Sequence, residues 1–305
     1  MSVTPIPNQQ PNRFFDATPR EIMKSIAVLF KLRVVSLLVL SAVGGAFLGA
    51  RGFPGWLNFG LITLTGLLTA AGASAINQFW ERESDRLMAR TASRPLASGS
   101  IKHPKIVLLI AILLIFVPSL AVLPFRPWLT VYLLVGAFIY VVIYTIWLKP
   151  RTQLNIVIGG AAGSAAVISG GAVVGMHHDP AVLALAAVMF VWTPAHFWSL
   201  AIMMKDQYVA ADTPMLPSQS SGRLAAWMVF AHAVPTVMGS LMLGAVPGLG
   251  IWYFIPVLMF SIDLMRRNIK LIWDPTVPHA RSLFLASNYY LAVVLLAIMI
   301  VTPFT

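Results

Sequence analysis

The stretch N-Q-F-W-E-R-E-S-D-R-L-M-A-R-T-A-S-R-P-L, residues 77–96, holds three of the ten acidic and four of the 21 basic residues of a chain that is only 10% charged. It continues directly from an apolar run. Asn77, Glu81 and Asp85 are spaced four apart, so at about 100° per residue they form one polar stripe on a helix, whereas Glu83 falls on the other side. The stretch therefore predicts an apolar helix whose end carries a polar site.

Apolar runs long enough to cross a bilayer recur along the chain, which has 305 residues, 58% hydrophobic residues and a mean hydropathy of +0.82. These values predict an all-α, polytopic membrane protein. We expect a polar tail and interfacial segment over 1–30 and a single transmembrane domain over 31–305. The predicted bundle has nine transmembrane helices, over 34–50, 57–77, 104–123, 128–147, 155–176, 181–203, 224–244, 248–265 and 283–302.

The charged residues fall almost entirely on one side of this predicted bundle. Of the 21 basic residues, only Arg51 and Arg126 fall in loops of the other side, and Asp179 is the only acidic residue there. Because cytoplasmic loops carry an excess of Lys and Arg, the N-terminus is predicted to be cytoplasmic and the C-terminus outside. A charge at the bilayer centre costs roughly 2.5–3.5 kcal/mol. The stripe is therefore expected at the cytoplasmic interface or in a wet cavity of the bundle.

Composition also excludes several functions. The chain has no cysteine, which rules out disulfides, Cys-ligated zinc and a thiol nucleophile. Its net charge of +11 arises from basic residues in short turns, which indicates membrane topology rather than nucleic-acid binding. The first 25 residues are polar and proline-rich, unlike a signal peptide, and we expect a mobile tail leading into a short interfacial helix.

The stripe has the chemistry of a site for a magnesium-bound diphosphate. Carboxylate and amide oxygens are hard ligands that suit Mg²⁺, which usually shares its coordination with substrate phosphates. Arg90 and Arg94 follow the stripe, and a guanidinium fork matches phosphate geometry. Lys149 and Arg151 form a second cationic element after the fourth run, although helix-end anchoring explains them equally well, and Asn155 adds a further phosphate contact.

A third polar segment surrounds the end of the sixth run. A lone histidine in an apolar helix is usually a core residue, but Pro194 breaks the helix just before His196. His196 and Asp206 are ten residues apart, about 15 Å on a continuous helix. We therefore expect His196 in a substrate pocket beneath Asp206, and Asp206 at a cytoplasmic helix end where it could hold a second Mg²⁺.

Other patterns have simpler interpretations. The small-xxx-small spacings of Gly45–Gly49 and Gly159–Gly163 predict close helix packing in lipid. The basic cluster at 266–270 is typical of a topology determinant. The segment 177–179, with two histidines and an aspartate, is expected in a solvated turn rather than a metal site.

These residues resemble the UbiA-type family of intramembrane prenyltransferases, from about Lys31 to the end of the last predicted span. The family motif N-x-x-x-D-x-x-x-D is matched by Asn77, Glu81 and Asp85, with Glu81 in place of the usual Asp. Three further segments are similar to its haem-modifying branch: Met88–Leu96, Asn155–Gly163 and Trp192–Leu216. The chain departs from that branch in having Ala195 in place of the second Pro of P-P-H-F, Asp212 in place of a Gly, and Asp206 alone in place of a second D-x-x-x-D.

The resemblance implies transfer of a farnesyl group from farnesyl diphosphate to the vinyl group of protoheme IX (haem B), with Mg²⁺ as cofactor and haem O as product. It implies nine helices, a bacterial inner membrane, an active site facing the cytoplasm and a downstream haem A synthase as a possible partner. The implied residues are, for catalysis and metal, Asn77, Glu81, Asp85 and Asp206; for diphosphate, Arg90, Arg94, Lys149, Arg151 and Asn155; and for haem, His196 and Tyr208.

Two alternatives stay open. A member of the same family could transfer the prenyl group to an aromatic quinone precursor, since the first motif is common to the whole family. A small-molecule transporter would also have many helices. Transporters, however, usually carry ionisable groups near the membrane midplane, whereas here such groups are predicted at one face.

Overall fold

The computed structural model describes residues 18–304, so most of the predicted tail lies outside the described residues. Within that range the chain is helical and has no strand. The helices are α1 (Pro19–Leu29), α2 (Leu32–Ala50), α3 (Trp56–Arg86), α4 (Pro104–Ala121), α5 (Pro127–Phe138), the π-helix η2 (Ile139–Leu148), α6 (Asn155–Gly159), α7 (Ala161–Val173), α8 (Pro180–Met203), α9 (Lys205–Ala210), α10 (Gly222–Met242), α11 (Gly250–Trp273) and α12 (Val277–Val301). Three short 3-10 turns are η3 (Leu216–Ser218), η4 (Leu243–Ala245) and η5 (Thr302–Phe304).

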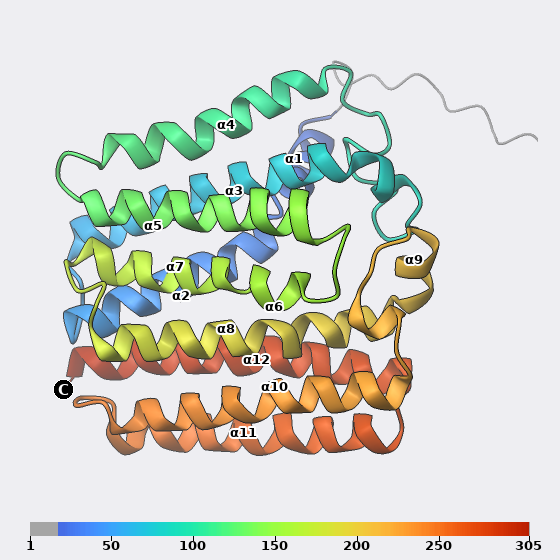
Figure 1. Ribbon diagram of the computed structural model, residues 1–305. Coiled ribbons are helices and arrows are strands. Elements are labelled where there is room, and N and C mark those ends of the chain that lie inside the picture. Colours follow the sequence, from blue (N-terminus) through green and yellow to red (C-terminus); the bar gives the residue numbers. More distant parts are fainter. Residues whose placement is uncertain (1–17, 305) are drawn as a thin grey trace, which may run out of the picture.

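The long helices lie side by side in one bundle, with their ends at two opposite faces (Figure 1). One face carries α1, the loop 87–103, the turn after η2, α9 and the α11–α12 turn; we call it the charged end, on the right in Figure 1. Among the described basic residues, only Arg51 and Arg126 belong to the opposite end, as the sequence predicted. There Arg51 forms an ion pair of 3.0 Å with Asp179, which also caps the N-terminus of α8.

Eight described segments are long and apolar enough to cross a membrane, where the sequence predicted nine. Each overlaps one predicted span. The remaining predicted span, 248–265, has no counterpart among the eight; it corresponds to α11. The helix is 24 residues long, but Asp263, Arg266 and Arg267 interrupt its apolar stretch.

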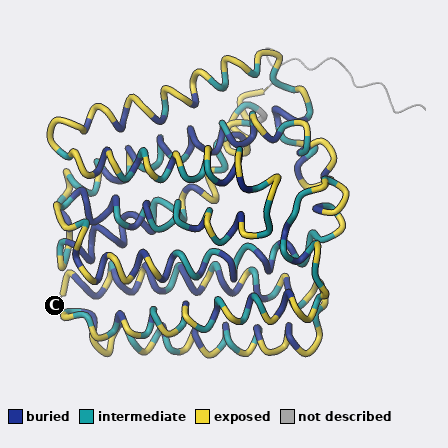
Figure 2. Tube along the Cα trace, viewed as in Figure 1, coloured by how far each residue is buried: buried dark blue, intermediate teal, exposed yellow. Residues whose placement is uncertain are grey.

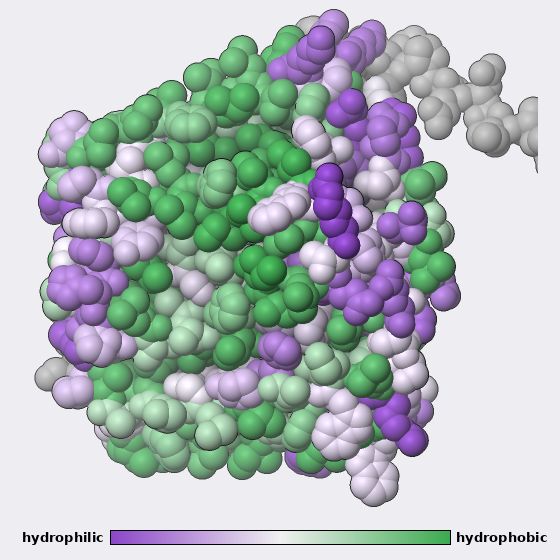
Figure 3. Space-filling model, viewed as in Figure 1, coloured by the Kyte–Doolittle hydropathy of each residue, from purple (hydrophilic) through white to green (hydrophobic). Residues whose placement is uncertain are grey.

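The surface agrees with a membrane protein. Figure 3 shows a broad hydrophobic band between two more polar ends. Exposed tryptophans lie near helix ends, where an aromatic belt would meet the bilayer interfaces. They are Trp56, Trp128 and Trp252 towards the opposite end, and Trp80, Trp147, Trp227 and Trp273 towards the charged end.

Small residues let the central helices approach each other closely. A Cβ atom on Gly45 of α2 would lie 2.1 Å from the Val167 carbonyl oxygen of α7, and one on Gly170 would lie 1.7 Å from the Ala42 carbonyl oxygen. Neither position has space for alanine. The predicted packing role is confirmed for Gly45, and Gly170 adds a second close approach between α2 and α7.

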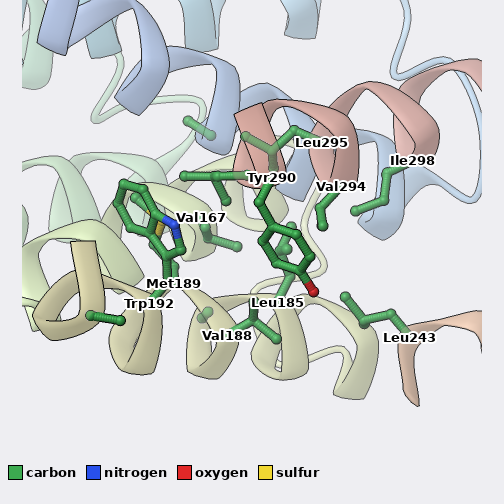
Figure 4. Close-up of a cluster of buried hydrophobic side chains, with 14 of the residues drawn as sticks. Val167, Leu185, Val188, Met189, Trp192, Leu243, Tyr290, Val294, Leu295 and Ile298 are labelled. Carbon is green, nitrogen blue, oxygen red and sulfur yellow. The ribbon is translucent and has the colours of Figure 1, made fainter. Parts of the chain in front are cut away.

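The core fills the space between α7, α8 and α12. Figure 4 shows Leu185, Val188 and Trp192 of α8 facing Tyr290 and Leu295 of α12. Buried residues gather along these central helices in Figure 2, whereas α4 at the edge is largely exposed. Among the polar residues that remain buried, the largest group is on α3.

Candidate active site

The predicted stripe is the polar inner face of the last turns of α3. Asn77, Glu81 and Asp85 are only 1%, 8% and 4% exposed. Glu83 points outward and pairs with Arg86 at 2.5 Å. α3 continues to Arg86, nine residues beyond the end of the predicted span. Its regular helical turn therefore places all three stripe residues on one face, near the charged end.

Each stripe residue contacts a cationic side chain from a different segment. The amine of Lys31, between α1 and α2, donates to Oδ1 of Asn77 at 2.6 Å. Lys149 Nζ lies 2.6 Å from Oε1 of Glu81. In the loop after α3, the Arg94 guanidinium lies 2.7 Å from Oδ2 of Asp85.

When Lys31 is protonated, the cluster holds three cations against two carboxylates. Burial, followed by the nearby charge of Arg94, lowers the pKa of Lys31 to about 7. Burial acts in the same direction on Lys149, but the Glu81 carboxylate outweighs it and the pKa of Lys149 is raised. A partly buried site with an excess of positive charge suits a polyanion.

The π-helix η2 gives the cluster one of its walls. Hydrogen bonds to the fifth residue back widen its turn to about 4.4 residues, and the amide of Lys149 continues the pattern by donating to the Tyr144 carbonyl at 2.8 Å. Tyr140 and Lys149 are then about two full turns apart, on one face. On an α-helix they would be about 180° apart.

Three side chains of this face reach the cluster. The Tyr140 hydroxyl accepts from Lys31 at 3.2 Å, and Lys149 holds Glu81. Thr145 accepts from Nδ2 of Asn77 at 3.0 Å and donates to the Tyr140 carbonyl at 2.8 Å. The wide turn thus positions a phenol, a hydroxyl and an amine against the stripe at once.

The loop 87–103 folds back over the stripe. The buried Thr91 hydroxyl donates to the Asp85 carbonyl at 2.9 Å, which fixes the turn that leads to Arg94. Arg90 is exposed, and its backbone amide donates to Oε1 of Gln207 on α9 at 3.2 Å. Of the two predicted arginines, the structure brings Arg94 onto the stripe and leaves Arg90 at its rim.

Arg151 and Asn155 lie differently from the prediction. Arg151 donates to the Ile146 and Trp147 carbonyls at 2.9 and 2.8 Å, so its guanidinium caps η2 instead of facing the stripe. Asn155 is fully buried and donates to the Thr152 and Pro214 carbonyls at 2.6 and 3.2 Å. Its Oδ1 has no hydrogen-bond partner within the described chain.

The structure does not bring Asp206 to the stripe acids. Within residues 18–304, no three His, Asp or Glu side chains are grouped as a possible metal site. α8 ends at Met203 and α9 starts a separate turn at Lys205, so Asp206 does not continue the face of α8 and is exposed. Tyr208 is the buried residue of α9. It lies close enough to Lys149 to contribute to the raised pKa of that amine.

His196 lies deeper in the bundle, within a stack of aromatic rings. Its imidazole is 4.4 Å from the Trp192 ring and 4.6 Å from the Phe284 ring, both nearly parallel to it. Nδ1 lies 2.8 Å from the Ser287 hydroxyl. The histidine is thus held between α8 and α12 in an apolar, aromatic setting, at some distance along α8 from α9.

The sequence interpretation missed Lys31, Tyr140, Thr145 and Gln207 as parts of this cluster. In the sequence, Lys31 stands out only as one of the many basic residues of the charged side. A usable signal was the set of polar groups in an otherwise apolar run, at 140, 145 and 149, which share a face only if the turn is wider than in an α-helix. Nothing comparable marks Gln207.

Comparisons with known proteins show the family and the fold of this chain. The UbiA prenyltransferase family matches residues 38–301. A curated relative, protoheme IX farnesyltransferase 2 of Paramagnetospirillum magneticum, is 37% identical over 279 residues, which cover 91% of this chain and 96% of the relative.

Two solved structures have a similar fold. A digeranylgeranylglyceryl phosphate synthase structure superposes with a TM-score of 0.76 at 18% identity, covering 93% of this chain and all of that one. A UbiA homologue from Archaeoglobus fulgidus, bound to DMAPP and Mg²⁺, gives 0.62 at 17% identity, covering 91% of this chain and 99% of that one. Since the family match spans most of the chain, and the relative is alike over nearly its full length, the protein belongs to the UbiA prenyltransferase family.

Proposed function

We propose that this enzyme transfers the farnesyl group of farnesyl diphosphate to the vinyl group of protoheme IX (haem B), giving haem O. The observation that carries the proposal is the end of α3, where three buried oxygen-bearing side chains each meet a separate cation beside an apolar bundle. The relatives named protoheme IX farnesyltransferase support the choice of substrates.

The stripe fits a magnesium ion by its donor chemistry. One amide and two carboxylate oxygens on one buried helix face are hard ligands, and Mg²⁺ takes few protein ligands when substrate phosphates supply the others. Asn77, Glu81 and Asp85 would hold it. When bound, the ion neutralises charge on the diphosphate and so favours its departure.

The three cations of the cluster are the counter-charges for the diphosphate. Lys31, Arg94 and Lys149 are partly buried, so their attraction for a polyanion is screened less than it would be at the surface. Arg90 at the rim adds a fourth positive charge on the approach. These side chains stabilise negative charge as the bond from C1 of the farnesyl group to the diphosphate oxygen breaks, with both electrons leaving on oxygen.

The apolar interior protects the reacting carbon. Aromatic and aliphatic side chains between the helices exclude water from the allylic cation until the vinyl π-electrons form the new bond to C1. Water then adds to the resulting haem-bound cation and loses a proton, giving a hydroxyethylfarnesyl group. His196 in its ring stack and Tyr208 beside the cluster are the residues we assign to the haem.

We also propose nine spans, with the N-terminus in the cytoplasm and the C-terminus outside. Twenty-four residues give α11 a length of about 36 Å. Its charges are confined to the half nearer the charged end, where long basic side chains can reach the interface. The excess of Lys and Arg supports a cytoplasmic position for this end, and with it a site on the cytoplasmic side of a bacterial inner membrane. A haem A synthase would then consume the product.

The deciding experiment supplies the purified protein in nanodiscs with Mg²⁺, farnesyl diphosphate and either haem B or 4-hydroxybenzoate. We expect farnesylated haem, detected by mass spectrometry, and loss of product when EDTA removes the metal. Product from 4-hydroxybenzoate alone would favour the quinone-pathway alternative. Solute flux in proteoliposomes without either product would favour a transporter.

A further inference from the structure

A cavity with both charged and apolar side chains lies away from the stripe, between α11 and α12. It has a volume of about 630 Å³ and is lined by Phe260, Asp263 and Arg267 of α11 and by Val277, Pro278, Arg281, Ser282, Leu285, Ala286 and Tyr289 of α12. The lining combines two guanidinium groups and one carboxylate with aromatic and aliphatic side chains. It lies towards the charged end, because it includes the first turns of α12.

One arginine of the cavity is held in place and the other is free. Arg267 Nε donates to Oδ2 of Asp263 at 2.7 Å, and its Nη1 donates to the Ser282 hydroxyl across the two helices. Arg281 is exposed and makes no hydrogen bond or ion pair with the described chain. Asp263 offsets only one of the two charges, so the described lining of the cavity has a net positive charge.

The cavity opens to the outside of the bundle. Leu285 and Tyr289 on its wall are 44% and 64% exposed, and Phe260 is 39% exposed. On the same helix, Phe284 and Ser287 face the other way and contact His196. The body of α12 therefore separates this cavity from the ring stack, and a molecule bound here would not lie in the proposed haem site.

We propose that this cavity binds an anionic glycerophospholipid of the adjacent leaflet. Its phosphate would pair with Arg281 and with the unused nitrogen of Arg267, because guanidinium groups bind phosphate oxygens in a fixed fork. The first acyl carbons would lie against Phe260, Leu285 and Tyr289. A fixed arginine, a free arginine and an apolar wall match a headgroup with its chain better than they match a free ion.

The test is native mass spectrometry of the whole protein in detergent, titrated with dioleoylphosphatidylglycerol, dioleoylphosphatidylcholine or inorganic phosphate. We expect retention of phosphatidylglycerol and at least fivefold weaker retention of the zwitterionic lipid. Arg281→Gln should weaken phosphatidylglycerol binding about five- to tenfold, the worth of one basic side chain at an anionic lipid. Arg281→Lys should recover part of that loss.

Arg266→Gln is the matched control, since Arg266 is an exposed arginine of α11 that does not line the cavity. It should leave phosphatidylglycerol binding unchanged. Equal losses in the two Gln variants, or equal binding of the two lipids, would overturn the proposal. So would binding of inorganic phosphate as tightly as the lipid, or displacement of the lipid by haem B.

Discussion

The end of α3 and the segment around α9 lie at the same end of the bundle, but the chain builds them in different ways. On α3 one unbroken helix of 31 residues continues past the apolar run and holds Asn77, Glu81 and Asp85 on its inner face. At α9 the chain stops one helix at Met203 and begins another at Lys205. Continuous helical periodicity fixes the side chains of the first region, whereas a break turns Asp206 outward in the second.

This difference indicates that α3, and not α9, carries the residues that act on the diphosphate. Each of the three stripe residues of α3 already has a cation in contact with it, from the α1–α2 junction, from the loop 87–103 and from the end of η2. α9 contributes the buried Tyr208 and the Gln207 contact to Arg90, but no carboxylate. Substitutions on α3 should therefore affect transfer far more than substitutions at Asp206.

The largest effect is expected for Asp85→Asn. The change keeps the size of the side chain but removes a metal ligand and the partner of Arg94. Transfer to haem should fall about a thousandfold in rate, the upper range for loss of one electrostatic contact in a catalytic site. Rates are measured on purified protein, with membrane insertion checked by the amount extracted.

Glu83→Gln is the control for this variant, because Glu83 is an exposed acid on the same turn of α3. It should keep nearly full activity. If Asp85→Asn retained a near-normal rate, the assignment of the stripe to the diphosphate site would be wrong.

Deletion of Val142 should lower transfer by about a hundredfold. The deletion shortens the distance from Tyr140 to Lys149 by one residue, which turns the amine away by roughly 60–80° whether the segment stays π or becomes α. Lys149 would then leave Glu81. The measurement is farnesyl diphosphate affinity and turnover, together with the thermal unfolding midpoint.

Val142→Ala is the matched control, since the Val142 side chain is exposed and the substitution keeps the spacing. It should bind farnesyl diphosphate normally. A deletion variant that is folded and fully active would show that the wide turn of η2 does not position Lys149.

Lys31→Gln is expected to weaken farnesyl diphosphate binding about tenfold, the usual worth of one charge-assisted hydrogen bond. The amide keeps a donor for Asn77 but loses the positive charge. Lys24→Gln, which removes an exposed charge from α1, should leave the affinity unchanged. Equal effects of the two variants would assign Lys31 to surface electrostatics instead of the site.

Much of the fold could be predicted from the sequence, because long apolar runs and the distribution of Lys and Arg reflect bilayer physics directly. The stripe could be predicted as well, since four-residue spacing on a helix is a local property. The π-turn of η2 is marked only by the polar groups at 140, 145 and 149, because an apolar run such as Ile139–Leu148 packs in either helix type. The positions of Arg151 and Asp206 could not be predicted, because each lies just beyond a helix end, where the chain direction is set by tertiary contacts.

The smallest effect is expected for Asp206→Asn, which also tests the opening comparison most directly. An exposed carboxylate that is not grouped with Glu81 and Asp85 has little influence on a metal held by α3. Transfer should therefore fall no more than about threefold, and the Mg²⁺ concentration for half-maximal rate should stay unchanged. The Mg²⁺ titration shows whether Asp206 is a metal ligand. Loss of a metal ligand raises the Mg²⁺ concentration needed for half-maximal rate, even when turnover at saturating Mg²⁺ is unchanged. A hundredfold loss with a matching shift would mean that α9 turns inward when the diphosphate binds and adds a second carboxylate group to the site, so that the break at Met204 acts as a hinge.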